Sequence, residues 1–415
     1  MLRAQSYQFI TISHLLLRKV IFSIVIINAV NYVEKDIKLC HESMQGVMMK
    51  PLHEPLYITA VFRQVGDAYK THRNTDLKYS REENPTIMNL EAKLAKLEGS
   101  DHALAFNSGM SAIATVYLSL LESGDNIVLS MEGYGTTIEL AKLLRKFGIN
   151  TTLAYPNAES LIEAIDENTK LVLVETMTNP TLKVIDVPEV IKRCKEVGAT
   201  IVVDNTFVTP LLYKPLKDNA DFVVHSLTKY IAGHNDVVGG ALLWNGEFIQ
   251  DLWDWRRRLG TIIQPFEAWM IERGMRTLEV RFERQCKSAQ AIAEFLKEHP
   301  KVKDVHYPGL KDDPYHSIAR KLFERDLFGA VVTFDVGSES NAVSFLRELR
   351  KIFPSPSLGG VESIATYPVK SAAKSMDEEQ RKVLGITEGL IRLSVGLEPI
   401  DELIEDLDRA LGVVK

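Results

Sequence analysis

The sequence predicts an α/β protein in which a large domain is built on a mostly parallel seven-stranded sheet and is followed by a smaller C-terminal α+β domain. Between residues 103 and 244, short runs rich in Val, Leu and Ile alternate with amphipathic stretches of helical period. The runs lack polar alternation, so both faces of the sheet are expected to be covered. Strands that alternate with helices at this spacing imply right-handed βαβ crossovers. After residue 244 the order changes to long helices and then a mixed remainder.

The individual elements follow from these runs in chain order. We expect strands at 103–106, 126–130, 152–155, 171–175, 200–204, 222–226 and 240–244. The helices between the earlier strands are expected at 110–121, 137–146, 158–165 and 188–197. Residues 247–296 form long helices, one of which begins at Pro265. The remainder is expected to hold strands around Val305, 328–336 and 391–395, and helices near 341–351 and 399–411.

Composition excludes several classes of protein. The 415 residues suffice for about two or three domains, and 46% hydrophobic with 25% charged residues is typical of a globular chain with a large core. The net charge of −6 argues against a nucleic-acid partner. Three scattered cysteines without a CxxC pair or metal-ligand spacing argue against a disulfide framework and a metal site. They favour a reducing compartment, so we expect a cytoplasmic protein with no membrane partner.

Residues 1–45 differ from the rest of the chain. Val20 to Val30 is mostly apolar and follows two basic residues, as in a signal peptide. The run is shorter than the roughly 20 residues that cross a bilayer, and no small-residue cleavage site follows it. A signal or anchor, an additional packed element and an upstream start are the alternatives. We favour the upstream start, because three methionines precede the ordinary sequence: Met44, Met48 and Met49.

Polar and small residues follow the predicted strands at their carboxyl ends, where open α/β sheets bind ligands. The segments are Asn107-Ser108-Gly109, Tyr134-Gly135-Thr136, 176–180, 204–206 and Ser226-Leu227-Thr228-Lys229. A lysine such as Lys229 is more often a solvated surface residue. Schiff-base chemistry, however, needs a desolvated lysine amine held against an aldehyde, and Ser226 and Thr228 would serve as phosphate ligands.

Three other residues each have a structural and a functional interpretation. Asp204, after three β-branched residues, is either a turn former or a carboxylate that keeps a pyridinium nitrogen protonated. Ser108 is either a helix N-cap or part of a phosphate cradle at a helix start. The ring of Tyr134 could stack on a flat cofactor. Their occurrence at successive strand ends favours the functional interpretation.

Together these motifs resemble the Cys/Met-metabolism family of pyridoxal-phosphate (PLP) enzymes over Pro51 to Leu411. They are Tyr79-Ser80-Arg81, Asn84-Pro85-Thr86, Ser108-Gly109-Met110, Tyr134-Gly135, Glu175 with Asn179-Pro180-Thr181, Val203-Asp204-Asn205-Thr206, Ser226 to Tyr230, Ser357 to Ser363 and Ile391 to Gly396. The resemblance implies a fold-type I, aminotransferase-like PLP-dependent transferase. It also implies a homotetramer built as a dimer of dimers.

The resemblance also assigns roles. Lys229 would hold the cofactor and then move protons between carbons of the substrate, and Asp204 would pair with the pyridine nitrogen. Tyr134 would stack on the ring and assist catalysis. Phosphate ligands would be Gly109, Met110, Ser226 and Thr228, with Tyr79 and Arg81 reaching the phosphate from the neighbouring subunit.

Substrate binding follows from the same resemblance. Arg392 would clamp the substrate carboxylate, helped by Ser357, and Asn179 would contact that carboxylate or the cofactor. Apolar neighbours on both sides argue against a solvated strand arginine at position 392. The expected organisation is an extension (1–45), an arm that contributes to the neighbouring subunit's active site (46–85), a PLP-binding domain (86–265) and a C-terminal domain (266–415).

The sequence indicates the family more clearly than the particular enzyme within it. Methionine γ-lyases typically carry a cysteine shortly after the stacking tyrosine, where Thr136 and Thr137 stand here. The stretch 359–363 is similar to cystathionine γ-synthase and γ-lyase, so Glu362 is expected to read a distal amino group. Lys78, in place of an acidic residue, and the segment 365–371 depart from the family pattern and weigh against that recognition.

We therefore expect a cystathionine γ-synthase or γ-lyase of trans-sulfuration, with the choice between them open. The alternatives within the family are methionine γ-lyase, homoserine-ester sulfhydrylase and cystathionine β-lyase. The alternative of a different class is a non-catalytic PLP-binding homologue.

Overall fold

The computed structural model describes residues 41–42, 48–49, 51–62 and 77–415. The predictions for Val20 to Val30 and for Met44 lie outside these residues. Met48–Met49 form strand β2, which pairs antiparallel with β1 (His41–Glu42). The chain divides into two units, residues 1–89 and 90–415, and each is described by itself.

In the first unit, the side chain of Asn84 holds a turn together. Its Nδ2 donates to the carbonyl of Tyr57 at 3.0 Å, and its Oδ1 accepts the N–H of Thr86 at 2.9 Å. Helix α2 (Pro85–Glu98) starts at this turn, and the proline at its first position suits a helix start because the missing N–H would have no intrahelical partner.

The second unit holds a seven-stranded sheet, and the predicted fold class is confirmed. The strand order is β3 (His102–Phe106), β9 (Gly240–Trp244), β8 (Phe222–Ser226), β7 (Thr200–Asp204), β6 (Thr169–Glu175), β4 (Asn126–Ser130) and β5 (Asn150–Ala154). All neighbours from β8 to β5 pair in parallel, whereas β9 is antiparallel to both β3 and β8. The predicted bounds of β4, β7, β8 and β9 match those observed.

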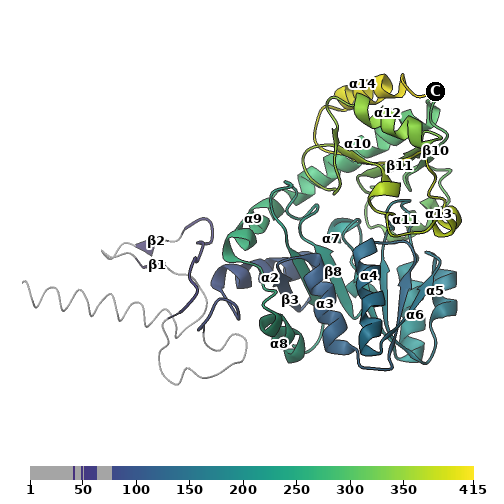
Figure 1. The fold of residues 1–415 in the computed structure, drawn as a ribbon. Coiled ribbons are helices and arrows are strands. Elements are labelled where there is room, and N and C mark those ends of the chain that lie inside the picture. Colours follow the sequence, from purple (N-terminus) through teal and green to yellow (C-terminus); the bar gives the residue numbers. More distant parts are fainter. Residues whose placement is uncertain (1–40, 43–47, 50, 63–76) are drawn as a thin grey trace, which may run out of the picture. The chain divides into compact units, whose positions relative to one another are not determined.

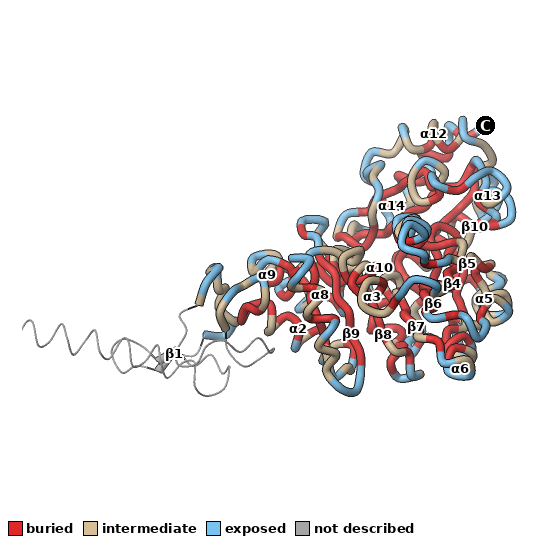
Figure 2. The backbone as a smooth tube through the Cα atoms, turned by 60° about the horizontal axis from the view of Figure 1, so that its bottom comes forward, coloured by how far each residue is buried: buried red, intermediate tan, exposed pale blue. Residues whose placement is uncertain are grey.

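Helices cover the sheet, as Figure 1 shows. They are α3 (Gly109–Leu120), α4 (Gly135–Leu143), α5 (Ala158–Ala164), α6 (Val187–Val197), the short α7 (Thr209–Leu212) and α8 (Gln250–Leu259). Alternate strand residues such as Leu104 and Phe106 point to one face, where they pack with Val116 of α3 and Trp253 of α8. Strands β8 and β9 in the middle of the sheet are almost wholly buried, whereas the edge strand β5 is buried only at its end (Figure 2).

Beyond the sheet, α9 (Pro265–Met275) and α10 (Leu278–Glu298) are the predicted long helices. A five-stranded sheet follows, in the order β10 (Asp304–His306), β11 (Val331–Asp335), β14 (Leu390–Ser394), β13 (Ile364–Thr366) and β12 (Phe353–Pro354). Its helices are α11 (His316–Leu322), α12 (Glu339–Glu348), α13 (Glu378–Leu384) and α14 (Ile400–Leu411). The predicted smaller α+β domain is confirmed.

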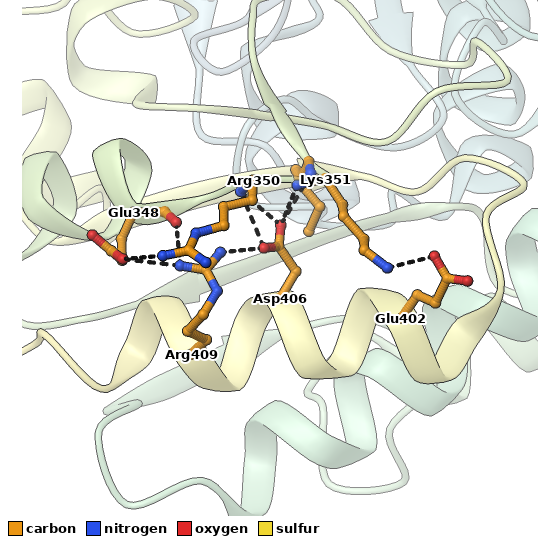
Figure 3. Close-up of polar contacts among 7 residues, drawn as sticks. Glu348, Arg350, Lys351, Glu402, Asp406 and Arg409 are labelled. Atoms are coloured by element: carbon orange, nitrogen blue, oxygen red, sulfur yellow. Dashed lines mark hydrogen bonds and ion pairs between the residues drawn. The ribbon is translucent and has the colours of Figure 1, made fainter.

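A buried carboxylate anchors the segment that leads into β12. Asp406 of α14 accepts three consecutive backbone N–H groups, those of Arg350, Lys351 and Ile352, at 2.9–3.2 Å (Figure 3). Arg409, one turn further along α14, bonds both Asp406 and Glu348. These contacts hold the residues that precede β12 in place. The strand itself has only two residues, too few for its own pairing to position it.

Within the described ranges, no helix combines the length and the apolar character that crossing a bilayer requires.

Candidate active site

Functional side chains gather at the carboxyl ends of β6, β7 and β8. The register places Glu175 opposite Asp204 on neighbouring parallel strands, and Ser226 ends β8 beside Gly240 of β9. A turn after β8 then brings in Lys229, whose N–H bonds the carbonyl of Ser226 at 3.2 Å. The strand-end arrangement predicted from the sequence is therefore present.

Lys229 is largely withdrawn from water. Its Nζ donates to the hydroxyl of Ser357 at 2.6 Å. Burial, and then the positive charge of Arg392, lower the pKa of Lys229 to about 8, although Asp204 opposes the shift. A larger fraction of this amine is neutral near pH 7 than of an ordinary lysine, which suits attack on an aldehyde.

Ser357 lies between the two cations of the site. Its hydroxyl accepts from Lys229, and its backbone carbonyl accepts from Nη2 of Arg392 at 2.7 Å. The residue has φ +85°, a left-handed conformation that is uncommon outside glycine. Gly359, two residues on, has φ +84°, and a Cβ there would lie 2.7 Å from the backbone nitrogen of Tyr230. Glycine is therefore required for this loop to approach the Lys229 turn so closely.

Arg392 of β14 is buried without a carboxylate partner among the described residues. Its Nη1 donates to Oδ1 of Asn179 at 2.7 Å. Its Nε is buried and has no hydrogen-bond partner in the described part of the chain. Burial lowers the pKa of Arg392 to about 10. A buried guanidinium whose acceptors are neutral and whose Nε is unused is suited to an external carboxylate.

Asp204 ends β7, and its carboxylate accepts hydrogen bonds from Thr206, including that of the backbone N–H at 3.0 Å. Burial raises the pKa of Asp204, while hydrogen bonds from Thr206 and the positions of His225 and Lys229 act in the opposite direction. No cation bonds this carboxylate within the described residues, which suits a cationic partner from outside the chain.

The start of α3 lies directly against β8 and β9. Ser108 is the N-cap, and its hydroxyl accepts the N–H of Ser111 at 3.1 Å. A Cβ on Gly109 would lie 3.3 Å from Cα of Ser226, and one on Gly240 would lie 2.2 Å from the carbonyl oxygen of Ser108. Because the first N–H groups of a helix have no intrahelical partner, this junction is suited to bind an anion.

Tyr134 is the N-cap of α4 and is 51% exposed. Its backbone N–H donates to Oε1 of Glu175. The exposed ring is available to a ligand at the ends of β4 and β6.

A cavity of about 650 Å³ opens beside these groups. Its lining includes Asn107, Thr228, Asn235, Glu267, Ser357 and Ile364. Thr228 is held by its own turn, because its hydroxyl accepts the N–H of Gly239 at 3.0 Å. Glu362 is exposed and lies outside the lining, and it accepts from Asn235 at 2.8 Å.

Comparison with known proteins identifies the family to which the chain belongs. The model of the family described as "Cys/Met metabolism PLP-dependent enzyme" matches residues 37–412. The chain belongs to this family. It is thus a PLP-dependent carbon–sulfur lyase or transferase, as predicted.

Relatives of different activity are similarly close. The cystathionine γ-lyase of Bacillus subtilis is 39% identical, with 86% of this chain and 93% of the relative aligned. The cystathionine β-lyase of Lactococcus lactis subsp. cremoris is also 39% identical, with the same coverage. A crystal structure of cystathionine γ-synthase from Xanthomonas oryzae pv. oryzae in complex with cystathionine superimposes with a TM-score of 0.83, at 37% identity, over 92% of this chain and 95% of that one.

The residues of this Cys/Met-metabolism enzyme fit PLP. The amine of Lys229 with its lowered pKa suits the aldehyde. Asp204, to which no cation of the described residues is bonded, suits the pyridine nitrogen. The start of α3, with Gly109 pressed against Ser226, suits the phosphate. Met110 lies in the same turn, and its sulfur is 3.6 Å from the hydroxyl of Thr137.

Two expectations concern residues of the first unit. The guanidinium of Arg81 lies 5.4 Å from the centre of the Tyr79 ring, which is 41% exposed. Their place in a neighbouring subunit's site stays a prediction.

Sequence reasoning missed a buried ion pair behind the site. Nζ of Lys183 lies 2.7 Å from Oε2 of Glu132. It also donates to Thr181 and to the carbonyl of Leu384, the latter at 2.8 Å. Lys183 has apolar neighbours on both sides in the sequence, the same signal that pointed to Arg392.

Proposed function

We propose that the protein catalyses γ-replacement or γ-elimination on sulfur amino acids, as a cystathionine γ-synthase or cystathionine γ-lyase. The observation that carries the proposal is the chain of contacts from Lys229 through Ser357 to Arg392 and Asn179. It links an amine suited to proton transfer with a guanidinium suited to a carboxylate, next to a cavity large enough for an amino acid with a long side chain.

In the proposed reaction the residues of the site have separate tasks. PLP, when bound, supplies an electron sink for charge that develops on the substrate's α-carbon. Arg392 and Asn179 hold the substrate's α-carboxylate and so fix which bond at that carbon faces the lysine. Nζ of Lys229 removes a proton there and returns it at another carbon, and Ser357 keeps Nζ in place between the two transfers.

Two supporting assignments complete the proposal. Asp204 pairs with the pyridine nitrogen, and the start of α3 with Ser226 and Thr228 binds the phosphate. Glu362, which accepts a hydrogen bond from Asn235, is proposed to bind the distal amino group of the substrate at the rim of the cavity. The organisation expected from the sequence, including the arm at 46–85, the PLP-binding domain at 86–265 and a cytoplasmic homotetramer, belongs to the same proposal.

The test of activity compares substrates in parallel. Purified protein loaded with PLP receives an activated homoserine ester with cysteine, or cystathionine alone. Formation of cystathionine in the first assay supports the synthase, and release of 2-oxobutyrate and cysteine in the second supports the γ-lyase. Release of pyruvate and homocysteine would instead indicate a β-lyase. Lys229→Ala is the control, and a turnover that it retains would contradict the assignment.

The shared site has its own test. Lys229→Ala and Arg81→Ala variants are expected to be inactive alone, because one lacks the amine and the other lacks the phosphate contact across subunits. Mixed after reversible dissociation, they are expected to regain roughly a quarter of the wild-type sites, since random pairing restores one complete site in each mixed dimer. No recovery in a sample that contains mixed dimers would contradict the role of Arg81.

A further inference from the structure

Three carboxyl groups converge behind the candidate PLP site. Glu132 lies in the turn after β4, Glu175 ends β6 and Asp204 ends β7. Glu132 is 0% exposed and Glu175 is 8% exposed. Glu175 and Asp204 are register partners on adjacent parallel strands, which lie about 4.8 Å apart. Carboxylates this close repel each other, so they are not expected all to be ionised together.

The partners of each carboxyl group indicate which one holds the proton. Glu132 forms the ion pair with Lys183 and accepts two bonds from Thr181. Burial raises the pKa of Asp204, but hydrogen bonds from Thr206 and the nearby positions of His225 and Lys229 oppose that shift and favour its ionised form. Glu175 has no cation bonded to it anywhere in the described residues.

Burial, and then the negative charge of Asp204, raise the pKa of Glu175 well above its ordinary value. Glu132 acts in the same direction, and only the hydrogen bond from Tyr134 opposes the shift. Geometry and electrostatics therefore agree on Glu175 as the protonated member of the three.

Glu175 also holds the turn that carries Tyr134. Its Oε1 accepts the N–H of Tyr134, and a Cβ on Gly133 would lie 2.8 Å from the same oxygen. The backbone of Gly133 and Tyr134 thus closes directly over the carboxyl group. A neutral carboxyl group can make this contact, because its carbonyl oxygen is still an acceptor.

We propose that Glu175 is a positioning residue held in its neutral form. Its carbonyl oxygen fixes the Tyr134 turn, and its neutrality leaves Asp204 to carry the negative charge at the joined ends of β6 and β7. The inference rests on PLP binding at this edge and is independent of which sulfur amino acid is the substrate.

Glu175→Gln is the decisive variant, because glutamine is neutral, nearly the same shape and retains the carbonyl acceptor. We expect kcat/KM within about threefold of wild type, an unshifted pH profile and an unchanged visible absorbance of bound PLP. Glu175→Leu removes the acceptor, and we expect kcat to fall about tenfold and PLP retention to weaken. Glu139→Gln, the same exchange at an exposed position of α4, is the matched control.

A direct readout of the proton avoids dependence on turnover. Infrared spectra of PLP-free protein at neutral pH are expected to contain the C=O stretch of a protonated carboxyl group that disappears in Glu175→Gln and persists in Glu139→Gln. This measurement decides the protonation state even if Glu175→Leu does not fold. It also decides it if the proposed substrates are not turned over.

Three results would overturn the proposal. If wild type lacks the protonated-carboxyl band, or if Glu175→Gln shifts the pH profile and loses as much activity as Glu175→Leu, then Glu175 functions as a carboxylate. If Glu175→Leu matches Glu175→Gln in kcat and in PLP retention, the residue does not position Tyr134.

Discussion

The buried ion pair between Lys183 and Glu132 gives the sharpest prediction of stability. The ammonium of Lys183 contacts Oε2 of Glu132 at 2.7 Å, the carbonyl of Leu384 at 2.8 Å and the hydroxyl of Thr181. The two charged side chains are 7% and 0% exposed. Lys183→Met keeps a similar length and an apolar stem but removes the ammonium.

The expected loss of stability depends on which contacts Glu132 keeps in Lys183→Met. Removing one partner of a buried pair costs about 3–5 kcal/mol, since the other charge stays buried and uncompensated. Glu132 keeps both bonds from Thr181 on its other oxygen, which favours the lower end, about 3 kcal/mol. At about 2–4 °C per kcal/mol for a domain of 150–250 residues, the apparent Tm should fall on the order of 10 °C.

Thermal unfolding of PLP-free protein at one fixed concentration is the assay. In Lys183→Met/Glu132→Gln the unpaired charge is gone, so we expect the double variant to be more stable than Lys183→Met alone, a non-additive result. The matched control is Lys217→Met, which breaks an exposed ion pair with Glu324 and should cost less than about 1 kcal/mol. A loss in Lys183→Met as small as in Lys217→Met would refute the reasoning, as would strict additivity in the double variant.

Four further predictions concern the site and the C-terminal sheet. Lys229→Ala should lose at least about a hundredfold in kcat together with the visible absorbance of bound PLP, measured by assay and spectrum. Arg392→Lys should raise KM about tenfold in steady-state kinetics, because a single ammonium cannot grip a carboxylate with two parallel bonds. With the pKa of Lys229 at about 8, the rate at which PLP-free protein is reconstituted with PLP should rise up to about pH 8 and then level off, whereas with an ordinary lysine it would keep rising to about pH 10; a rate that keeps rising well above pH 8 would contradict the shift. For Asp406, burial acts to raise the pKa, but the N–H groups of residues 350–352 and Arg409 hold the pKa below its ordinary value. The stabilisation from this carboxylate is therefore present above the pKa of the unfolded state and is lost as the pH falls through the pKa of the folded state. The difference in Tm between wild type and Asp406→Asn should accordingly shrink in acid.

The central sheet was predictable because its strands are buried on both faces. Continuous apolar runs gave the bounds of β4, β7, β8 and β9 directly. Strands β5 and β6 begin two residues earlier than predicted, at Asn150 and Thr169, where polar residues start the strand and the apolar signal is absent. The two- and three-residue strands β12 and β13 are too short to show a period, and contacts from β14 and Asp406 position them.

The site could be predicted from the sequence only where its residues are close to one another in the chain. The turn after β8 could be inferred, because strand and motif are adjacent in the sequence. The contact between Arg392 and Asn179 joins residues 213 positions apart, and it depends on how the five-stranded sheet packs against the large one. The roles of Lys183 and Glu175 were missed for the same reason, since each depends on side chains from other strand ends.

The buried arginines show how a charge that serves the fold differs from one that serves a ligand. Arg281 and Arg392 are 4% and 5% exposed, and neither bonds a carboxylate within the described part of the chain. Arg281 nonetheless bonds through all three of its nitrogens, to Thr277 and to backbone carbonyls of Tyr230, Ile231 and Gly274. Arg392 has its Nε buried and without a partner in that same part of the chain. Because an unused buried donor costs free energy, the unpaired Nε of Arg392 fits the role proposed for this residue, which is to bind a carboxylate that arrives with the substrate.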